Sequence, residues 1–460
     1  MGATARLAEW AVGVRYEDIP EEAIAAAKRA ILDCTGCALA GGDERVARAL
    51  YHLGQQAGGE GEASILGSAE RASAQWAALV NGTLAHALDY DDVHMGVHGH
   101  PTAPTLPAGL ALGEVRDASG RELLAAYVVG VEVMGRLGGV VNPTHYDRGW
   151  HATATLGASG AAVAGARMLQ LEPTQLRHAL GMACSFASGL RQNFGTDTKP
   201  LHAGAAARNG VLAAQLAAEG VDADPNIFEA PNGFCSVAGV PGRVLEESDL
   251  ADLGRAWQVV NPGLGFKLFP SCYSTHRPIN AVLALAERYD LAPERVERVE
   301  CAASYSAVQM LIHARPKTAL EGKFSMQYCL AAALIDRRVG LSHFTDEQVN
   351  RADIQALIPR VSVSVHPDLA RPEQLSADFA EVTVQLVDGR SYTERVEFPA
   401  GHARRPLTDA ELDAKYLECA GLRLGRDGAQ RSLERLRNLE RLESVRKLVT
   451  YLVPAVAVGA

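Results

Sequence analysis

The sequence predicts a mainly α-helical protein with a large all-helical domain and a smaller α+β domain. Residues 102–220 are very rich in Ala and Gly, and small residues at helical spacing let helices pack closely together. After Pro262 the composition changes, and short segments with alternating apolar residues appear. From Thr408 the pattern is helical again, which we interpret as a return of the chain to the first domain. The predicted domains are 1–265 together with 405–460, and 266–404.

The N-terminal region is predicted to be a series of amphipathic helices. Two of them cover residues 5–19 and 21–40, and the second has Glu21 and Glu22 in its first turn and Gly41 at its end, which are common start and stop signals. Further helical patterns cover 43–56 and 72–88, and Gly220 is a predicted helix stop.

The α+β domain is predicted from local strand signals. Strand character appears at 296–304 and 361–366, and 378–398 form the clearest hairpin, with an Asp388-Gly389 turn between two alternating runs. The predicted helices of this domain are 276–288 and 324–336, and those of the C-terminal region are 408–421 and 427–451.

Composition narrows the class of function. The chain has 48% hydrophobic and 21% charged residues, as ordinary soluble globular proteins do, and its net charge of −10 makes nucleic acid or an anionic membrane an unsuitable partner. We find no signal peptide pattern and no apolar run of about 20 residues, so no membrane span is expected. The eight Cys are scattered, and Cys34-x-x-Cys37 has no second pair, which favours packing over zinc or redox chemistry. We therefore expect a cytoplasmic protein.

The most informative stretch is a polar loop that follows the helical pattern ending at Leu88. Within twelve residues it holds three carboxylates and three imidazoles, and Pro101 closes it. Because His titrates near neutrality and a neighbouring carboxylate raises its basicity, such a loop suits proton transfer. The alternative is a solvated turn that collects Asp. We interpret the loop as one wall of an active site, formed by Asp89, Asp91, Asp92, His94, His98 and His100.

A metal site is an alternative for the same loop. His94, His98 and His100 could bind zinc with an Asp as the fourth group, but their spacing matches no tight zinc signature. The sequence also contains no glycine-rich phosphate loop, dinucleotide fingerprint or nucleophile elbow. We therefore predict no metal and no cofactor, and acid–base chemistry on a small anion.

Lys199 is conspicuous because only seven of the 44 basic residues are Lys, and no other Lys lies between Lys28 and Lys267. It precedes Pro200 and an Ala-rich helix, so burial is expected. Burial lowers the pKa of a Lys, and a neutral amine is a competent base. The alternative is a Lys at a helix edge that points to water. His202 follows one turn later, placed to support it.

Other candidate residues lie in separate charged islands. His151 lies at the mouth of an apolar helix, where a structural role is the alternative. Lys267 and Arg277 are cations for an anionic substrate, and they lie where the helical domain passes into the α+β domain, a usual place for a ligand cleft. His276 begins a helix beside Arg277. Tyr328 lies on a helical face, where core packing is the alternative.

Six segments, in this order, resemble the MmgE/PrpD family, which includes 2-methylcitrate dehydratases, cis-aconitate decarboxylases and iminodisuccinate epimerases. They are AHALDYDD with HGHPTAP, GWHATATLGA, FGTDTKPLHAG, FKLFPSCYSTHRPINA, EGKFSMQY and PLTDAELDAKY, and together they extend over almost the whole chain. The resemblance implies a large helical domain built from both chain ends, a smaller α+β lid domain, a homodimer and no cofactor.

The resemblance also implies where the active site lies. Family positions fall on Asp89, His100, His151, Lys199, Lys267, His276 and Tyr328, and Tyr146 matches a Tyr that the epimerase branch pairs with the Lys. We thus predict catalytic Asp89, His100, Tyr146, His151, Lys199 and His276, and substrate-binding Lys267, Arg277 and Tyr328.

The expected activity is that of a cofactor-independent lyase. It would be a dehydratase, similar to 2-methylcitrate dehydratase, or a decarboxylase, acting on a small di- or tricarboxylate by proton abstraction next to a carboxylate. The GHPTAP run differs from the GHPSDN-like run of the dehydratases and from the HPSG of the decarboxylases, so the reaction stays open. The alternatives are an epimerase with Tyr146 and Lys199 on opposite faces of one carbon, a metal-dependent hydrolase, and a helical binding module without chemistry.

Overall fold

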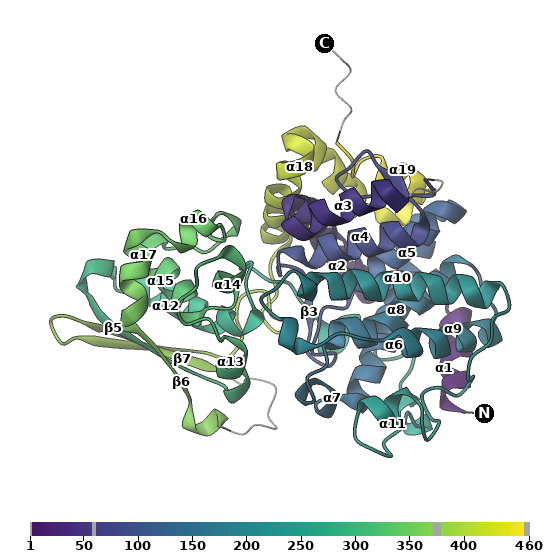
Figure 1. The fold of residues 1–460 in the computed structure, drawn as a ribbon, viewed down its shortest axis with the longest axis horizontal. Coiled ribbons are helices and arrows are strands. Elements are labelled where there is room, and N and C mark those ends of the chain that lie inside the picture. Colours follow the sequence, from purple (N-terminus) through teal and green to yellow (C-terminus); the bar gives the residue numbers. More distant parts are fainter. Residues whose placement is uncertain (1, 58–60, 371–378, 455–460) are drawn as a thin grey trace, which may run out of the picture. The chain divides into compact units, whose positions relative to one another are not determined.

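The computed structural model describes residues 2–57, 61–370 and 379–454, which form two compact units. The first, here called the helical unit, comprises Met1–Asn193, Asp197–Phe266 and Thr408–Ala460. The second, the mixed unit, comprises Phe194–Thr196 and Lys267–Leu407 (Figure 1). The protein is mainly α-helical with a smaller α+β part, as the sequence predicts.

The helical unit is built from helices of both chain ends, with two short strand pairs. Its helices are α1 Ala3–Gly13, α2 Glu21–Ala40, α3 Arg45–Ala57, α4 Ala74–Ala87, α5 Thr102–Arg116, α6 Gly120–Val141, α7 Thr144–Asp147, α8 Ala152–Met168, α9 Pro173–Phe186, α10 Thr198–Ala218, α11 Phe234–Ala238, α18 Asp409–Arg437 and α19 Val445–Val449. Its strand pairs are β1 Ala63–Ser64 with β2 Arg71–Ala72, and β3 Val93–His94 with β4 Leu264–Gly265.

Three predicted helices have clearly different bounds in the structure. The helix predicted over 5–19 ends at Gly13, because Val14 is extended and the Asp18 carboxylate accepts the Arg15 backbone N–H in a separate short turn. The two C-terminal helices predicted at 408–421 and 427–451 are instead one long helix, α18, kinked at Gly425, followed by the short α19. Gly425 has φ of +67°, a left-handed conformation that Gly adopts at little cost.

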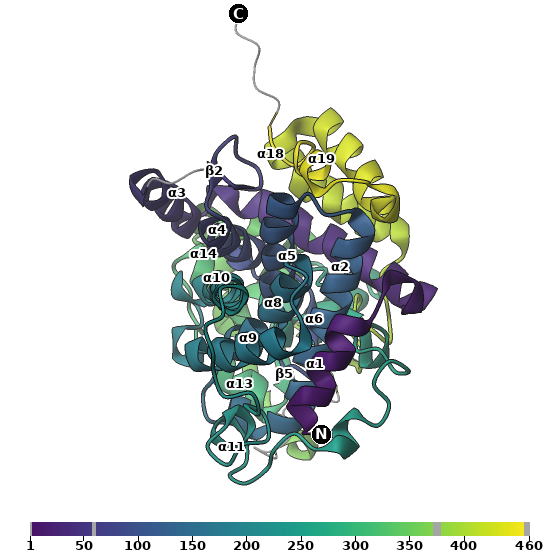
Figure 2. The ribbon, with the colours of Figure 1, turned by 90° about the vertical axis from the view of Figure 1, so that its right-hand side faces the viewer.

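Helix α10 packs against α4 and α8 in the helical unit (Figure 2). The contact between α10 and α4 is close because it is made by glycines. A Cβ added to Gly204 would lie 2.1 Å from the Leu79 carbonyl oxygen, and one added to Gly82 would lie 2.9 Å from the Gly204 Cα. This close approach brings the end of α4 next to the start of α10.

The mixed unit contains a four-stranded sheet in the order β6-β5-β7-β8, in which β5 and β6 are parallel and the other pairs antiparallel. Helices α12 and α15 pack on the sheet around an apolar core, and the Asp388-Gly389 turn joins β7 and β8. The elements are α12 His276–Arg288, β5 Val296–Ala303, α13 Tyr305–Met310, α14 Ala319–Lys323, α15 Met326–Asp336, α16 Asp346–Val349, α17 Ala352–Leu357, β6 Val361–Val365, β7 Ala380–Leu386 and β8 Ser391–Val396.

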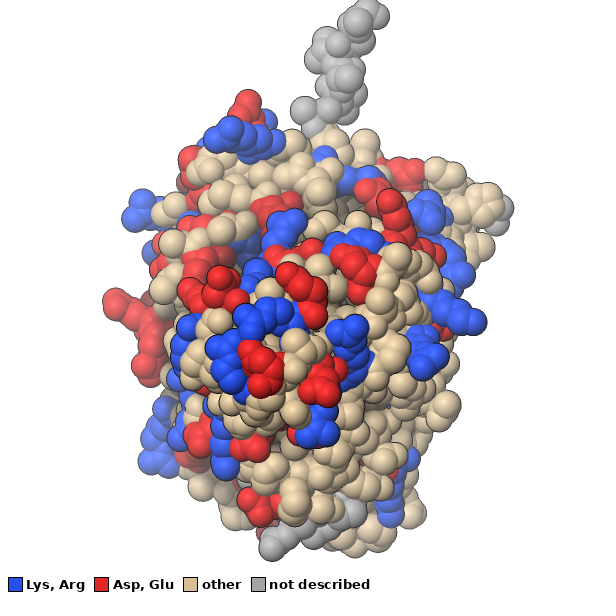
Figure 3. All heavy atoms as spheres, turned by 90° about the vertical axis from the view of Figure 1, so that its left-hand side faces the viewer, with Lys and Arg blue, Asp and Glu red and all other residues tan. Residues whose placement is uncertain are grey.

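The described residues include one helix with the length of a membrane span, and the charges on one face of the surface are mixed. Helix α6 is long and apolar enough to cross a membrane by composition, but 94% of its most apolar window is buried inside the protein, as in ordinary core helices. On the face that Figure 3 shows, Lys and Arg lie interspersed with Asp and Glu. This face therefore has no broad positive patch of the kind that binds nucleic acid.

Candidate active site

The polar loop after α4 is buried and folds back on the end of that helix. Asp89 has φ of +53°, which turns the chain so that the Asp91 Oδ1 lies 2.8 Å from the His86 Nδ1. Asp89, Asp91 and Asp92 are buried, so the loop is not the solvated turn that the sequence left as an alternative. Buried carboxylates need partners, and each of the three has a different one.

Asp89 pairs with Lys199. The Lys199 Nζ lies 2.7 Å from the Asp89 Oδ1, and both side chains are only 6% exposed. Lys199 is in the first turn of α10, which the contact between α10 and α4 brings to the loop. A carboxylate is the partner that a buried ammonium requires. The structure therefore presents Lys199 as half of an ion pair, where the sequence suggested a neutral base.

His100 is oriented by the same loop. Its Nδ1 lies 2.7 Å from the Asp92 carbonyl oxygen, which can only accept, so Nδ1 carries the proton in the neutral ring. The Nε2 is then the basic nitrogen, and it lies 3.9 Å from the Asp89 Oδ1. The His100 backbone N–H donates to the Thr153 hydroxyl on α8, which fixes the position of the residue. Asp89, Lys199 and His100 thus form one cluster that can hold and move a proton.

Asp92 stabilises the polar loop through hydrogen bonds to neighbouring helices. The Thr102 hydroxyl donates to the Asp92 Oδ2 at 2.8 Å, and the Tyr127 hydroxyl lies 2.7 Å from the Thr102 hydroxyl. Burial, and then the nearby Asp91 charge, raise the pKa of Asp92 well above its usual value. The chain of hydrogen bonds from Asp92 through Thr102 to Tyr127 therefore connects the loop to α5 and α6.

His151 and His202 form a second pair beside the cluster. Their Nδ1 atoms are 3.0 Å apart, so one ring donates and the other accepts. Burial lowers the pKa of His151 well below its usual value and lowers that of His202 to about 4. The sequence suggested that His202 supports Lys199, whereas the hydrogen-bond partner that the structure gives it is His151. Both rings are neutral near pH 7, with His151 5.9 Å from the His86 ring.

Tyr146 lies on α7, and its ring packs against the guanidinium of Arg191. The Arg191 guanidinium lies 3.9 Å from the centre of the Tyr146 ring and donates to the Tyr146 carbonyl oxygen, and the His98 ring packs 5.8 Å away. These contacts hold the ring in place. The catalytic role of Tyr146 opposite Lys199 stays a prediction.

Lys415 reaches the loop from the C-terminal helix α18. Its Nζ lies 2.6 Å from the Asp33 Oδ1 and donates to the Tyr90 carbonyl oxygen at 2.7 Å. Lys415 and His86 are not among the residues predicted from the sequence, although Lys415 is one of seven Lys and lies in the PLTDAELDAKY segment. Tyr90 lies between Asp89 and Asp91, so Lys415 anchors the middle of the polar loop.

The structure does not support the zinc site suggested for His94, His98 and His100. The His94 Nε2 lies 3.2 Å from the Gln258 carbonyl oxygen, and its Nδ1 accepts the Val97 backbone N–H, so both nitrogens bind the backbone. A different group, His86, Asp89, Asp91 and His100, has nitrogen and oxygen atoms all within 4.8 Å of one another, close enough to surround a cation. Lys199 already supplies a positive charge to that group through Asp89.

The remaining predicted residues lie in the mixed unit. The His276 ring packs between Phe269 and Tyr273, 5.1 and 5.0 Å from their ring centres. The Arg277 Nε donates to the Glu397 carbonyl oxygen at 2.7 Å. Tyr328 is fully buried in the apolar core, and its hydroxyl donates to the His343 carbonyl oxygen. The catalytic role of His276 and the substrate-binding roles of Lys267, Arg277 and Tyr328 stay predictions.

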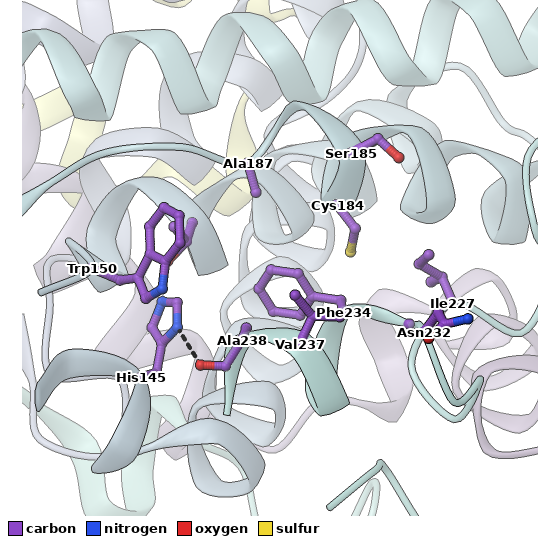
Figure 4. Close-up of a pocket in the computed structure, with 12 residues that line it drawn as sticks. His145, Trp150, Cys184, Ser185, Ala187, Ile227, Asn232, Phe234, Val237 and Ala238 are labelled. Carbon is purple, nitrogen blue, oxygen red and sulfur yellow. Dashed lines mark hydrogen bonds between the residues drawn. The ribbon is translucent and has the colours of Figure 1, made fainter. Parts of the chain in front are cut away.

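A pocket of about 250 Å³ lies in the helical unit (Figure 4). Trp150, the residue before His151, lines it, and so does His145, whose Nδ1 lies 3.0 Å from the Ala238 carbonyl oxygen. Burial lowers the pKa of His145 to about 4, and the described residues that line the pocket include no Lys or Arg. This pocket therefore offers no positive charge to a carboxylate, and it is not a suitable site for a polycarboxylate.

Comparison with known sequences identifies the family. Residues 5–242 match the MmgE/PrpD N-terminal domain, and residues 269–441 match the MmgE/PrpD C-terminal domain. The chain belongs to the MmgE/PrpD family. Similar proteins include the cis-aconitate decarboxylases of Homo sapiens, 29% identical over 96% of this chain and 92% of that protein, and of Mus musculus, 30% identical over 96% and 91%. The cis-aconitate decarboxylase of Aspergillus terreus is 28% identical over 98% of this chain and 96% of its own.

The predicted resemblance is thereby confirmed, and this MmgE/PrpD protein is an enzyme of the lyase class. The family match extends through both units, and the buried cluster of Asp89, His100 and Lys199 lies in the N-terminal match.

Proposed function

We propose that this protein is a carboxy-lyase that removes CO₂ from a small unsaturated tricarboxylate of the cis-aconitate type, without a metal or an organic cofactor. The observation that carries the proposal is the buried set of Asp89, Lys199 and His100, in which the Asp89 carboxylate lies within 4 Å of both the Lys199 ammonium and the oriented imidazole of His100. The names of the relatives, at 28–30% identity over nearly the whole chain, supply the substrate class.

The chemistry requires one proton transfer to carbon. The bond between a carboxylate and the adjoining carbon breaks, CO₂ leaves, and the electron pair moves through the neighbouring double bond to the carbon next to a second carboxylate. That carbon then takes a proton. A positioned acid supplies the proton, and a fixed positive charge stabilises the negative charge that develops on the carboxylate. His100, protonated at Nε2, and the Lys199 ammonium are suited to these two tasks.

Dehydration and epimerisation use the same proton transfer next to a carboxylate, so an assay must distinguish the three reactions. We suggest incubation with cis-aconitate in deuterated water, followed by mass spectrometry and measurement of CO₂. The expected result is loss of CO₂ with one non-exchangeable deuterium in each product molecule. Hydration of the double bond without loss of CO₂ would instead identify a dehydratase. Label exchange with inversion, tested on a chiral dicarboxylate, would identify an epimerase.

Substrate binding by Lys267 can be tested separately. We expect Lys267 to bind a substrate carboxylate in both the ground state and the transition state. Lys267→Met should then raise KM about 10- to 100-fold, which is the loss of affinity expected for one hydrogen bond to a charged group. The same substitution should change kcat by less than about threefold. The exposed Lys317 of the same unit offers the matched control, Lys317→Met, which should change neither constant. An unchanged KM in Lys267→Met would remove this residue from the substrate-binding set.

We expect the catalytic activity to be independent of metal ions. Because the Lys199 ammonium supplies the positive charge at Asp89, prolonged dialysis against a chelator should leave kcat unchanged. Elemental analysis before and after dialysis serves as the control. If chelation inactivates the enzyme and zinc or iron restores it, the group formed by His86, Asp89, Asp91 and His100 would have to be reconsidered as a metal site.

The homodimer implied by the family remains part of the proposal, and a native mass measurement would test it.

A further inference from the structure

His86 is a buried histidine that the proposed reaction does not use. It lies in the last turn of α4, and its side chain is fully buried. Its Nδ1 lies 2.8 Å from the Asp91 Oδ1, and its Nε2 has no hydrogen-bond partner among the residues that the structure describes. Since a carboxylate accepts, His86 donates from Nδ1. Burial lowers the pKa of His86 although Asp91 acts against that effect, so the ring is neutral.

Asp91 is the link between His86 and His100. Its second oxygen, Oδ2, lies 3.4 Å from the His100 Nδ1, and the rings of His86 and His100 are 4.4 Å apart. The Asp92 carbonyl already fixes the tautomer of His100, so Asp91 is not needed for that purpose. What Asp91 adds is a negative charge beside the nitrogen that remains protonated when His100 also takes a proton at Nε2.

We propose that His86 is a positioning residue: it holds the Asp91 carboxylate against the His100 Nδ1, where the carboxylate stabilises the imidazolium that His100 forms during turnover. A neutral His86 serves this purpose because a second positive ring 4.4 Å away would oppose the charge on His100. In other enzymes too, a buried carboxylate orients a catalytic histidine and stabilises its positive charge. The kinetic part of this inference rests on the proposed function, whereas the positioning part does not.

The environment of His100 defines what must be held constant in a test. Besides Asp91, the charged and titratable groups near it are His86 of α4, Asp89 and Asp92 of the loop, His151 of α8 and Lys199 of α10. None of these is changed by substituting Asp91, and His86 is neutral, so its replacement removes no charge. A shift in the titration of His100 would then report the position of the Asp91 carboxylate.

The test uses two substitutions of His86 that differ in one hydrogen bond. His86→Asn keeps an N–H donor near the place of Nδ1, and His86→Leu has a similar size without a donor. Asp91→Asn removes the charge directly, and it serves if His86→Leu fails to fold. The first measurement is a pH titration of the imidazole nitrogens by NMR in the full-length protein labelled with ¹⁵N-histidine, with His100→Gln to assign the His100 signals.

The expected result is a titration midpoint of His100 that falls by about one pH unit or more in His86→Leu and in Asp91→Asn, because a nearby carboxylate favours the charged imidazolium. His86→Asn should retain the wild-type midpoint. In kinetics, kcat of His86→Leu should fall about 10- to 100-fold with KM within about threefold, and His86→Asn should recover most of it. In a His100→Ala background, His86→Leu should have no further effect on residual turnover.

Three other outcomes contradict the inference. If the midpoint is unchanged in His86→Leu but falls in Asp91→Asn, Asp91 keeps its place without His86. If kcat falls equally in the wild-type and His100→Ala backgrounds, the role of His86 is general stability. If the midpoint moves and kcat does not, His100 carries no proton in the slow step. If the wild-type protein turns over no tricarboxylate, the proposed function fails, and the NMR titration still decides the positioning role.

Discussion

Lys199→Ala should abolish turnover, with kcat lowered by at least the 10²- to 10⁴-fold that general acid–base catalysis contributes. The Lys199 Nζ lies 2.7 Å from the Asp89 Oδ1, and His100 approaches the same carboxylate oxygen. Removing the ammonium takes away the positive charge of the cluster and leaves Asp89 buried without its ion-pair partner. The measurement is the rate of CO₂ release at saturating substrate.

Two controls separate chemistry from folding in this experiment. Lys447→Ala removes a Lys whose side chain is 71% exposed, and it should retain wild-type turnover. Lys199→Met combined with Asp89→Asn removes both charges of the buried pair, so it should recover stability lost by Lys199→Met alone while remaining inactive. Near-wild-type kcat in Lys199→Ala would remove Lys199 from the catalytic set and shift the chemistry to the histidines.

Local sequence signals predicted much of the secondary structure. The helix expected over 276–288 is α12, His276–Arg288, and the Asp388-Gly389 turn joins β7 and β8 as expected. These elements carry their signals within a few residues. The sequence does not predict the kink at Gly425 or the end of α1 at Gly13. A glycine inside an amphipathic pattern is compatible with a continuous helix, a kink or a helix end, so the pattern alone does not decide between them.

The candidate residues of the cluster could be found in the sequence, but their partners could not. Asp89, Asp91 and Asp92 are identical in chemistry and nearly adjacent, yet one pairs with Lys199, one with His86 and one with Thr102. This division depends on the left-handed backbone of Asp89 and on the glycine contact between α4 and α10. Neither can be derived from residue type, because Asp has several allowed backbone conformations and the glycine contact joins segments that are distant in the sequence.

Lys415→Met should lower the free energy of unfolding by about 3–5 kcal/mol, the usual cost of leaving one member of a buried ion pair alone. Lys415 and Asp33 are 3% and 0% exposed, and their charged atoms lie 2.6 Å apart, joining α18 to α2. Burial lowers the pKa of Lys415, but Asp33, Cys37, Tyr90 and Cys419 together outweigh that effect and the pKa is raised overall, so Lys415 is charged at neutral pH. Denaturant unfolding at pH 7 measures the effect.

Lys415→Met combined with Asp33→Asn distinguishes the two tasks of Lys415. The double variant has no buried unpaired charge, so most of the lost stability should return. It still lacks the hydrogen bond from the Lys415 Nζ to the Tyr90 carbonyl oxygen, which anchors the loop between Asp89 and Asp91. We therefore expect a stable protein whose kcat stays about tenfold or more below the wild-type value, since small displacements of catalytic groups are costly. Full recovery of kcat with stability would show that the ion pair stabilises the helices only and that the loop holds its geometry without Lys415.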